Sequence, residues 1–170
     1  DTGSVNAILK VGVQAPIDWT RTPQALIDEA TRRAYDFAAN PLRASIVEDP
    51  LGKRRNTRDN TPAMIQTELV EGDKVSVTVS AKGGGSENKT KFAVLNPSDS
   101  VADWVVETVA ALGAGWCPPG IIGLGIGGSV DKAMAMAKDA LKQPMHITEL
   151  RARGADTPED ALRLELYAPM

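Results

Sequence analysis

The chain has 170 residues, of which 42% are hydrophobic and 24% are charged, and its net charge is −3. This composition is typical of one globular domain or of one part of a larger enzyme. The acidic balance and the aromatic content of 4% predict no nucleic-acid partner. No apolar run approaches the roughly 20 residues of a membrane-spanning helix, so no membrane association is expected. A single cysteine without a signal peptide predicts a cytoplasmic location.

The first 60 residues predict a strand, a helix and a loop. The apolar residues of 5–13 indicate a buried strand. Thr22-Pro23 is typical of a helix start, with threonine as the cap and proline in the first turn, and the helix is predicted to end near Asn40-Pro41. Residues 48–60 are polar and carry turn residues, which predicts a loop.

Residues 62–71 and 74–81 predict a hairpin across the turn at 71–73. In its second arm, valine alternates with serine and threonine, so the valines share one face. These valines are Val75, Val77 and Val79.

Further strands are expected at 90–96 and 120–128, and further helices are expected to begin at Ser98, Ser129 and Thr157. The helix that begins at Ser98 should end at Gly113, because glycine commonly follows the last helical residue. Interleaved strands and helices predict an α/β fold with mixed β-sheets packed against helices.

The only cysteine, Cys117, lies in "GAGWCPPG", a stretch that prolines make rigid and glycines allow to turn sharply. One cysteine cannot form an internal disulfide, and it cannot bind a metal cluster alone. The residues leave three interpretations open: a structural thiol, a nucleophile, or one ligand of a set whose other members lie elsewhere. A rigid loop suits a ligand better than a nucleophile, which would also need a histidine base. The only histidine, His146, is not evidently placed for that role.

The stretch "AKGGGSENKTKF" combines Gly83–Gly85 with Ser86, Asn88, Lys89 and Thr90. Three glycines are expected where the backbone needs a positive φ or approaches a ligand closely. Hydroxyl, amide and ammonium groups on one loop suit a small anionic ligand. A flexible loop without a ligand explains the pattern equally well.

Two other features have a functional and a simpler interpretation. Arg43 follows a predicted helix and could bind a carboxylate with two hydrogen bonds, although a surface arginine is the simpler interpretation. The basic run at 53–58, "KRRNTR", is most simply a solvated loop and could alternatively attract an anionic substrate.

The spacing of Gly123, Gly125 and Gly128 fits the G-x-G-x-x-G pattern of a nucleotide-binding module. That pattern also needs an acidic residue after a second strand. Glu149 lies at about the right distance, but in a segment that is predicted to be helical. Glycines that allow a strand and a helix to pack closely are the alternative.

Taken together, "DTG", "NPLRASIVEDPLGKRRNTRDNTPA", "AKGGGSENKTKFAVLNPSDS" and "GAGWCPPGIIGLGIGGS" resemble the class I, iron–sulfur-dependent fumarate hydratases. The resemblance is to the N-terminal catalytic region or α subunit of that family, which includes L(+)-tartrate dehydratase. It covers essentially the whole chain, and "GGGSENKTKF" resembles the fumarate hydratase branch. The resemblance implies that residues 1–170 are a fragment of the catalytic domain of a larger, multidomain hydro-lyase.

The resemblance also implies a cofactor and a set of site residues. The family holds a [4Fe–4S] cluster on three cysteines, and Cys117 matches the second. The other two would lie before Asp1 and after Met170. The residues matching positions that contact the dicarboxylate substrate are Asp1, Arg43, Gly85, Asn88, Lys89 and Thr90.

The implied activity is the interconversion of (S)-malate with fumarate and water, with the open iron of the cluster as a Lewis acid. The implied partners are a C-terminal domain or β subunit and further copies of the chain. Three alternatives remain: dehydration of L(+)-tartrate or a related hydroxy-diacid, nucleotide binding by the glycines of 123–128, and a non-catalytic role in assembly.

Overall fold

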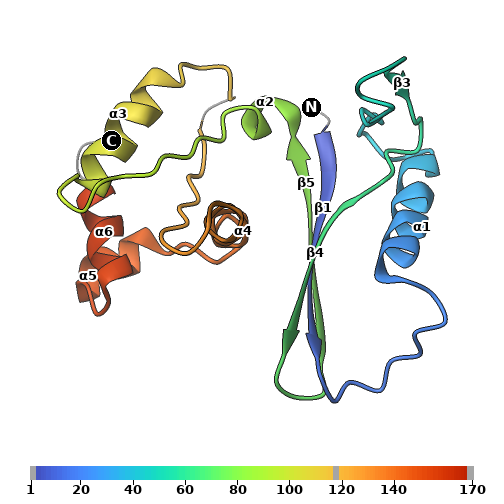
Figure 1. The fold of residues 1–170 in the computed structure, drawn as a ribbon, viewed down its shortest axis with the longest axis horizontal. Coiled ribbons are helices and arrows are strands. Elements are labelled where there is room, and N and C mark those ends of the chain that lie inside the picture. The colour runs from blue at the N-terminus through green and yellow to red at the C-terminus, as the bar shows by residue number, and fades with distance from the viewer. Residues whose placement is uncertain (1–2, 117–118, 168–170) are drawn as a thin grey trace. The chain divides into compact units, whose positions relative to one another are not determined.

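The computed structural model describes residues 3–116 and 119–167, and Figure 1 labels its helices and strands. The chain divides into two units, Asp1–Asn88 and Lys89–Met170. The first unit contains β1 (Gly3–Gly12), α1 (Pro23–Asp36), β2 (Val47–Glu48), β3 (Arg55–Asn56), β4 (Met64–Val70), β5 (Val75–Gly83) and α2 (Gly84–Glu87). The second unit contains α3 (Val101–Ala111), α4 (Val130–Ala140), α5 (Ile147–Arg153) and α6 (Pro158–Tyr167).

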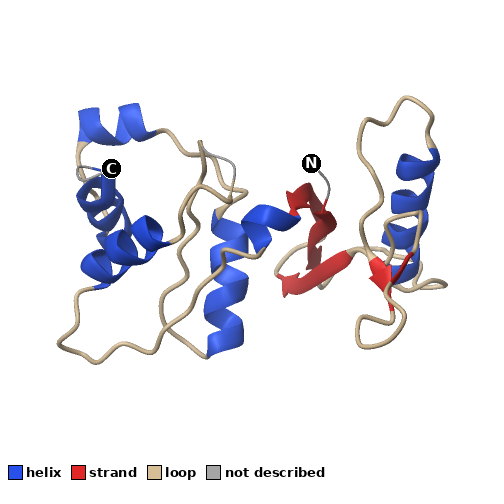
Figure 2. Cartoon of the chain, turned by 90° about the horizontal axis from the view of Figure 1, so that it is seen from above, coloured by secondary structure: helices blue, strands red, loops and turns tan. Residues whose placement is uncertain are grey.

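Strands and helices both occur, which confirms the predicted α/β fold (Figure 2). The described strands all belong to the first unit, where they form a three-stranded sheet and a two-stranded sheet. Among the described helices, none has the length and apolar character needed to cross a membrane.

β1 is the central strand of the larger sheet, whose order is β4-β1-β5. It runs parallel to β4 and antiparallel to β5, so the predicted hairpin between 62–71 and 74–81 is wrong. The turn between those two strands lies across the end of β1, where the Gly12 amide donates a hydrogen bond to the Lys74 carbonyl at 2.8 Å. Gly12 allows this approach because a Cβ there would lie 2.3 Å from the Gly72 carbonyl oxygen.

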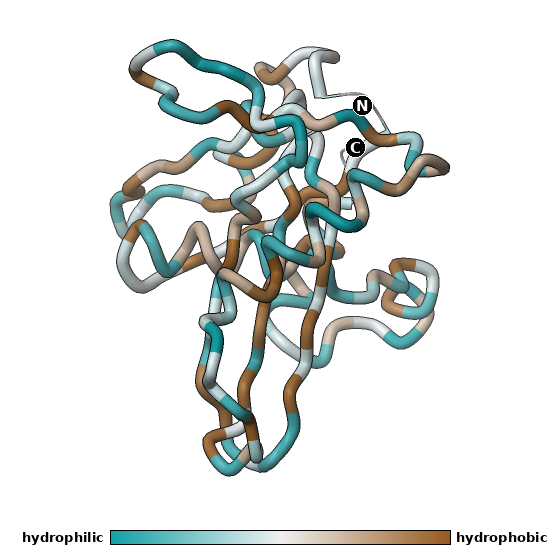
Figure 3. The backbone as a smooth tube through the Cα atoms, turned by 90° about the vertical axis from the view of Figure 1, so that its right-hand side faces the viewer, coloured by the Kyte–Doolittle hydropathy of each residue, from teal (hydrophilic) through white to brown (hydrophobic). Residues whose placement is uncertain are grey.

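The core of the first unit lies on one face of this sheet, and the predicted burial of residues 5–13 is largely confirmed. The core consists of Ala7, Leu9 and Val11 of β1, against which Ile17, Ile27 of α1 and Ile65 of β4 pack. Val79, Val77 and Val75 of β5 lie opposite the three β1 residues, which confirms that the valines share a face. They nevertheless remain between 47% and 59% exposed, because the described core partners lie over β1 and β4. Figure 3 shows the alternation of hydrophobic and hydrophilic residues along the strands.

α1 begins where the sequence predicts. The Thr22 hydroxyl accepts a hydrogen bond from the Ala25 amide at 3.2 Å, and proline occupies the first turn. The helix ends at Asp36, earlier than predicted, since Phe37 has an extended backbone. The Asn40 side chain then donates to the Ala34 carbonyl at 2.8 Å and so satisfies a group at the helix end.

The second unit departs further from the prediction. Residues 90–96 and 120–128 form no strand, and α3 is capped by Ser100, whose hydroxyl accepts from the Asp103 amide at 3.1 Å, instead of by Ser98. Gly113 has a φ of +64° just beyond the end of α3, as predicted. α3 packs against α6 in a core built around Ala102, Val105 and Leu166.

The segment 120–128 packs closely against α4, which begins after Ser129 as predicted. A Cβ at Gly123 would lie 2.2 Å from the Ala137 carbonyl oxygen, and one at Gly125 would lie 1.9 Å from the Ala133 carbonyl oxygen. These glycines therefore let an irregular segment approach a helix, where the sequence had predicted a strand.

α6 is joined to α5 by a cluster of charges. The Thr157 hydroxyl accepts from the Asp160 amide at 3.1 Å, which confirms the predicted cap. The Asp160 carboxylate is buried and lies 2.6 Å from Nη2 of Arg153 and 3.5 Å from Nη1 of Arg163. The hydrogen bond from Arg153 outweighs the opposing effect of burial and lowers the pKa of Asp160 below its usual 3.8.

This lowered pKa predicts an acid-sensitive contribution to stability. The contribution is present above the pKa of the unfolded chain, about 4, and is lost as the pH falls through the lower pKa of the folded protein. Asp160→Asn should therefore be less stable than the wild type at neutral pH, and the difference should shrink below pH 4. Chemical denaturation of the full-length protein at several pH values measures this. A difference between Asp160→Asn and the wild type that stays constant with pH would contradict the prediction.

Candidate functional site

Three segments of the first unit meet at Gly3, the first described residue of β1. The Gly3 carbonyl accepts hydrogen bonds from the Ser45 hydroxyl at 2.9 Å and from the Asn60 side-chain amide at 3.1 Å. Gly3 also pairs with Gly83 across β1 and β5. A Cβ at Gly3 would lie 1.7 Å from the Lys82 carbonyl oxygen, so this pairing needs a glycine.

The meeting at Gly3 brings together the segments that carry two predicted site residues, Arg43 and Gly85. Gly3 follows Asp1 by two residues, Ser45 follows Arg43 by two, and Gly83 precedes Gly85 by two. Arg43 is exposed in the irregular segment after α1. Asp1 itself lies outside the described residues.

Asn60 holds this arrangement together, although it is not among the site residues predicted from the sequence. Its side chain is fully buried, with an exposed fraction of 0%. Its Oδ1 accepts from the Ser45 amide at 2.7 Å and from the Ile46 amide at 3.2 Å, while its Nδ2 donates to the Gly3 carbonyl. The backbone of Asn60 has a φ of +60°, a left-handed conformation that asparagine adopts more readily than most residues. A single asparagine in a polar loop has no distinctive pattern, so the sequence offered no signal for this role.

The glycine-rich stretch is not the loop that the sequence predicts. β5 continues to Gly83, and Gly84–Glu87 form the single helical turn α2. Gly85 therefore does not have a positive φ. The described glycines that have one lie elsewhere in the chain. Asn88 follows the turn, and its amide donates to the Gly84 carbonyl at 3.0 Å.

In the second unit, Lys89 contacts the segment that leads to Cys117. Its Nζ donates to the Leu112 carbonyl at 2.8 Å, at the end of α3. A Cβ at Gly115 would lie 3.2 Å from Cε of Lys89. Thr90 is exposed. Cys117 lies outside the described residues.

The donor set of the chain fits one ligand position of a metal cluster and no more. Among residues 3–116 and 119–167, no group of three or more His, Cys, Asp and Glu side chains could hold a metal ion. The chain contains a single thiol. Iron–sulfur clusters are bound mainly by cysteine thiolates. Any further thiolates would therefore have to come from outside these 170 residues.

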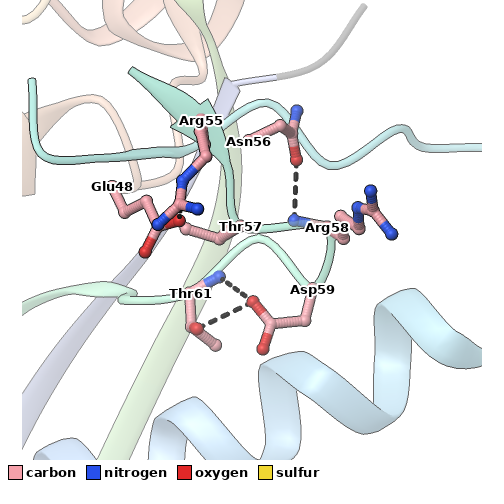
Figure 4. Close-up of a pocket in the computed structure, with 7 residues that line it drawn as sticks. All are labelled: Glu48, Arg55, Asn56, Thr57, Arg58, Asp59 and Thr61. Carbon is pink, nitrogen blue, oxygen red and sulfur yellow. Dashed lines mark hydrogen bonds and ion pairs between the residues drawn. The ribbon is translucent and has the colours of Figure 1, made fainter. Parts of the chain in front are cut away.

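A pocket lies beside the basic run and contains none of the predicted site residues (Figure 4). It is lined by Glu48, Arg55, Asn56, Thr57, Arg58, Asp59 and Thr61. Arg55 forms an ion pair with Glu48 at 3.0 Å. Burial by itself raises the pKa of Asp59, but hydrogen bonds from the Thr61 amide and hydroxyl and the charge of Arg32 outweigh it and lower that pKa. These paired charges favour the interpretation of this run as a structured surface loop over attraction of an anion.

The part of the chain that the structure describes does not have the elements that a nucleotide-binding site at Gly123, Gly125 and Gly128 would need. The fingerprint requires a strand before its glycines, and residues 120–128 form none. Glu149 lies in α5, as predicted, and so does not follow a second strand. Gly123 and Gly125 are explained by their contact with α4. His146 lies exposed immediately before α5.

Comparison with known proteins decides the family. A family model described as fumarate hydratase (Fumerase) matches residues 1–168. The chain belongs to the fumarate hydratase family. This confirms the resemblance inferred from the motifs, and the family is one of iron–sulfur hydro-lyases.

Curated relatives within the family carry tartrate dehydratase names. A protein of Methanocaldococcus jannaschii, provisionally named an L(+)-tartrate dehydratase alpha subunit, is 34% identical over 149 residues, covering 83% of this chain and 51% of the relative. L(+)-tartrate dehydratase alpha subunits of Escherichia coli strains UTI89 and K12 are 29% and 28% identical over 172 residues, each covering 97% of this chain and 54% of the relative. The chain thus spans about half the length of these relatives. The expected fumarate hydratase branch is not confirmed by these names.

Proposed function

We propose that this chain is the catalytic fragment of a [4Fe–4S]-dependent hydro-lyase that interconverts (S)-malate with fumarate and water. The observation that supports the proposal is that the segments next to Arg43 and Gly85 meet at Gly3, near the start of the chain. Residues far apart in the sequence are expected to meet in this way if they contact one small ligand.

Cys117 would hold the cluster as one of its thiolate ligands. The segment before it contains Gly113 with a φ of +64°, which turns the chain sharply at the end of α3. When bound, the cluster supplies an open iron that acts as a Lewis acid toward the carboxylate and hydroxyl of the substrate. The remaining ligands would come from outside this chain's 170 residues.

The chain's own polar groups would bind and orient the dicarboxylate. The Arg43 guanidinium can form two parallel hydrogen bonds with a carboxylate, which fixes the direction of the carbon skeleton. Asn88 and Thr90 can donate hydrogen bonds from their amide and hydroxyl groups. Because Gly85 has no side chain, the ligand could approach the backbone of α2 at this residue. Asp1 would accept a hydrogen bond near the reacting atoms.

A second candidate activity is dehydration of L(+)-tartrate, which the names of the relatives favour. Tartrate carries one hydroxyl group more than malate, so both substrates would use the same carboxylate contacts. Because the relatives are named alpha subunits, we also propose that a β subunit or a C-terminal domain completes the site.

Anaerobic reconstitution of the full-length protein with its partner subunit or domain tests the proposal. The reconstituted protein should bind iron and sulfide and should form malate from fumarate faster than it dehydrates L(+)-tartrate. Faster turnover of tartrate would replace the first candidate by the second. Absence of bound iron and of both activities would overturn the proposed function.

The variant Gly85→Ala tests whether Gly85 contacts the substrate or has only a structural role. Because Gly85 lies in a helical turn, alanine should leave the free energy of unfolding unchanged or raise it by up to about 1 kcal/mol. The added methyl group should nevertheless lower kcat/KM for the dicarboxylate, by about 10-fold or more. Ala81→Gly in β5 is a control that removes a methyl group nearby and should lower stability without lowering kcat/KM. Unchanged kinetics for Gly85→Ala would place Gly85 outside the site.

A further inference from the structure

Lys89 makes a contact that substrate binding does not explain. Its Nζ donates a hydrogen bond to the Leu112 carbonyl at 2.8 Å, and Leu112 is the C-terminal cap of α3. The last turn of α3 contains no basic residue. Cations are stabilising at this end of a helix, where unpaired carbonyl groups concentrate negative charge. Lys89, which precedes α3 in the sequence, therefore supplies the positive charge that the last turn of this helix lacks.

The stem of Lys89 runs beside the backbone that leads to the thiol. A Cβ built on Gly115 would lie 3.2 Å from Cε and 3.4 Å from Nζ of Lys89, so the side chain occupies the space next to this glycine. Gly115 precedes Cys117 by two residues. The contacts at Leu112 and Gly115 thus hold both ends of the short segment that joins α3 to the thiol.

The other side of the thiol segment is also held. A Cβ on Gly120 would lie 1.7 Å from Cζ3 of Trp116, so the indole ring packs directly on the Gly120 backbone. Two different side chains therefore contact the backbone two residues before Cys117, at Gly115, and three residues after it, at Gly120. Lys89 is the charged one of the two, and it reaches the segment from a distant part of the sequence.

We propose that Lys89 is a positioning residue for the Cys117 segment, not a ligand of the substrate carboxylate. By holding the end of α3 and the backbone at Gly115, Lys89 would restrict the chain just before Cys117 and so help the protein to retain the cluster. This inference rests on the proposed function, in which Cys117 is a ligand of the cluster. Groups that orient a metal ligand without touching the metal typically change metal affinity by about 10- to 100-fold when they are removed.

The two roles of Lys89 predict different measurements. A positioning residue should change how firmly the cluster is held, and should leave the KM of the cluster-loaded enzyme near that of the wild type. A carboxylate ligand should raise KM and leave cluster retention unchanged. Iron content is therefore the decisive readout, and it does not depend on turnover.

The experiment uses the full-length protein with its partner subunit or domain, reconstituted anaerobically. Lys89→Met is compared with Lys89→Arg, which restores a cation, and with Lys91→Met, which removes an exposed lysine from the same stretch. Bound iron and sulfide are measured, and then the rate at which a chelator removes the iron. Lys89→Met should lose iron about 10-fold faster than the wild type. Lys89→Arg should recover most of the retention, and Lys91→Met should match the wild type.

Each outcome decides a separate point. If the wild type binds no iron, the proposed function fails and this inference fails with it. If the wild type binds iron and Lys89→Met retains it equally well, only the inference on Lys89 fails. A raised KM in that case identifies Lys89 as a substrate ligand. Circular dichroism of the apoproteins checks the fold. If Lys89→Met does not fold, Lys89→Gln takes its place, and equal retention by the Gln and Arg variants would overturn the inference.

Discussion

Cys117→Ser in the full-length protein is expected to abolish hydro-lyase activity and to reduce bound iron. A serine hydroxyl is a hard ligand that stays protonated near neutral pH, whereas the iron of a cluster is held by soft thiolates. Cys117 is the only thiol that these 170 residues can contribute. If Cys117 is a ligand of the cluster, as proposed, its loss should disrupt the cluster as well as lower its activity. Iron content, the visible absorption of the reconstituted protein and turnover of fumarate measure the effect.

His146→Asn is the control for this variant. His146 is exposed immediately before α5, and it is the only histidine, so it is the one residue in the chain that could pair with Cys117 as a histidine base. If Cys117 is a cluster ligand, His146→Asn should leave iron content and turnover near those of the wild type. If Cys117 is a nucleophile, both variants should lose activity while iron content stays the same. Near-normal turnover of Cys117→Ser with an intact cluster would make the thiol structural.

The elements that could be predicted from the sequence are those determined by neighbouring residues. The caps at Thr22 and Thr157 bond to amides three residues away, so the sequence pattern contains both partners of each bond. The end of α3 could also be predicted, because it depends on the backbone conformation of a single residue, Gly113. β1 was also predictable, since a central strand is apolar on most of its length.

The largest errors concern pairing between distant parts of the chain. Residues 62–71 and 74–81 have the pattern of two strands joined by a turn, and both strands exist. Their partner is β1, more than 50 residues away from either. Alternation within a strand indicates its two faces but not its neighbour. Likewise, residues 120–128 form no strand, and Gly123 and Gly125 in this segment lie close to the backbone of α4.

The candidate site was predicted from the resemblance and not from periodicity. Nothing in the local pattern of "NPLRAS" or "KGGGSENK" indicates that the two stretches approach the start of β1. Their meeting depends on Gly3, which pairs with Gly83, and on Asn60, which joins the segment after Arg43 to the same carbonyl. Asn60 was missed because a single buried asparagine in a polar loop has no distinctive sequence pattern.

Asn60→Ala is expected to lower the free energy of unfolding by about 3 kcal/mol. The variant removes three hydrogen bonds and leaves the Ser45 and Ile46 amides, which belong to partly buried residues, without this partner. An unsatisfied buried group costs about 1–3 kcal/mol. The segment that carries Arg43 would lose its connection to Gly3, so KM for the dicarboxylate should rise as well. Chemical denaturation and steady-state kinetics of the full-length protein measure the two effects.

Two further variants separate the hydrogen bonds from the backbone conformation. Asn60 has a φ of +60°, so alanine adds strain of about 1 kcal/mol that glycine does not. Asn60→Gly should therefore be less destabilising than Asn60→Ala, and the loss common to both measures the side-chain contacts. Asn56→Ala is the matched control, because it removes two hydrogen bonds, one to the Ala44 carbonyl and one from the Arg58 amide, from an exposed asparagine in the same loop. If Asn60→Gly were as stable as the wild type with an unchanged KM, Asn60 would not be what holds the Arg43 segment against the start of β1.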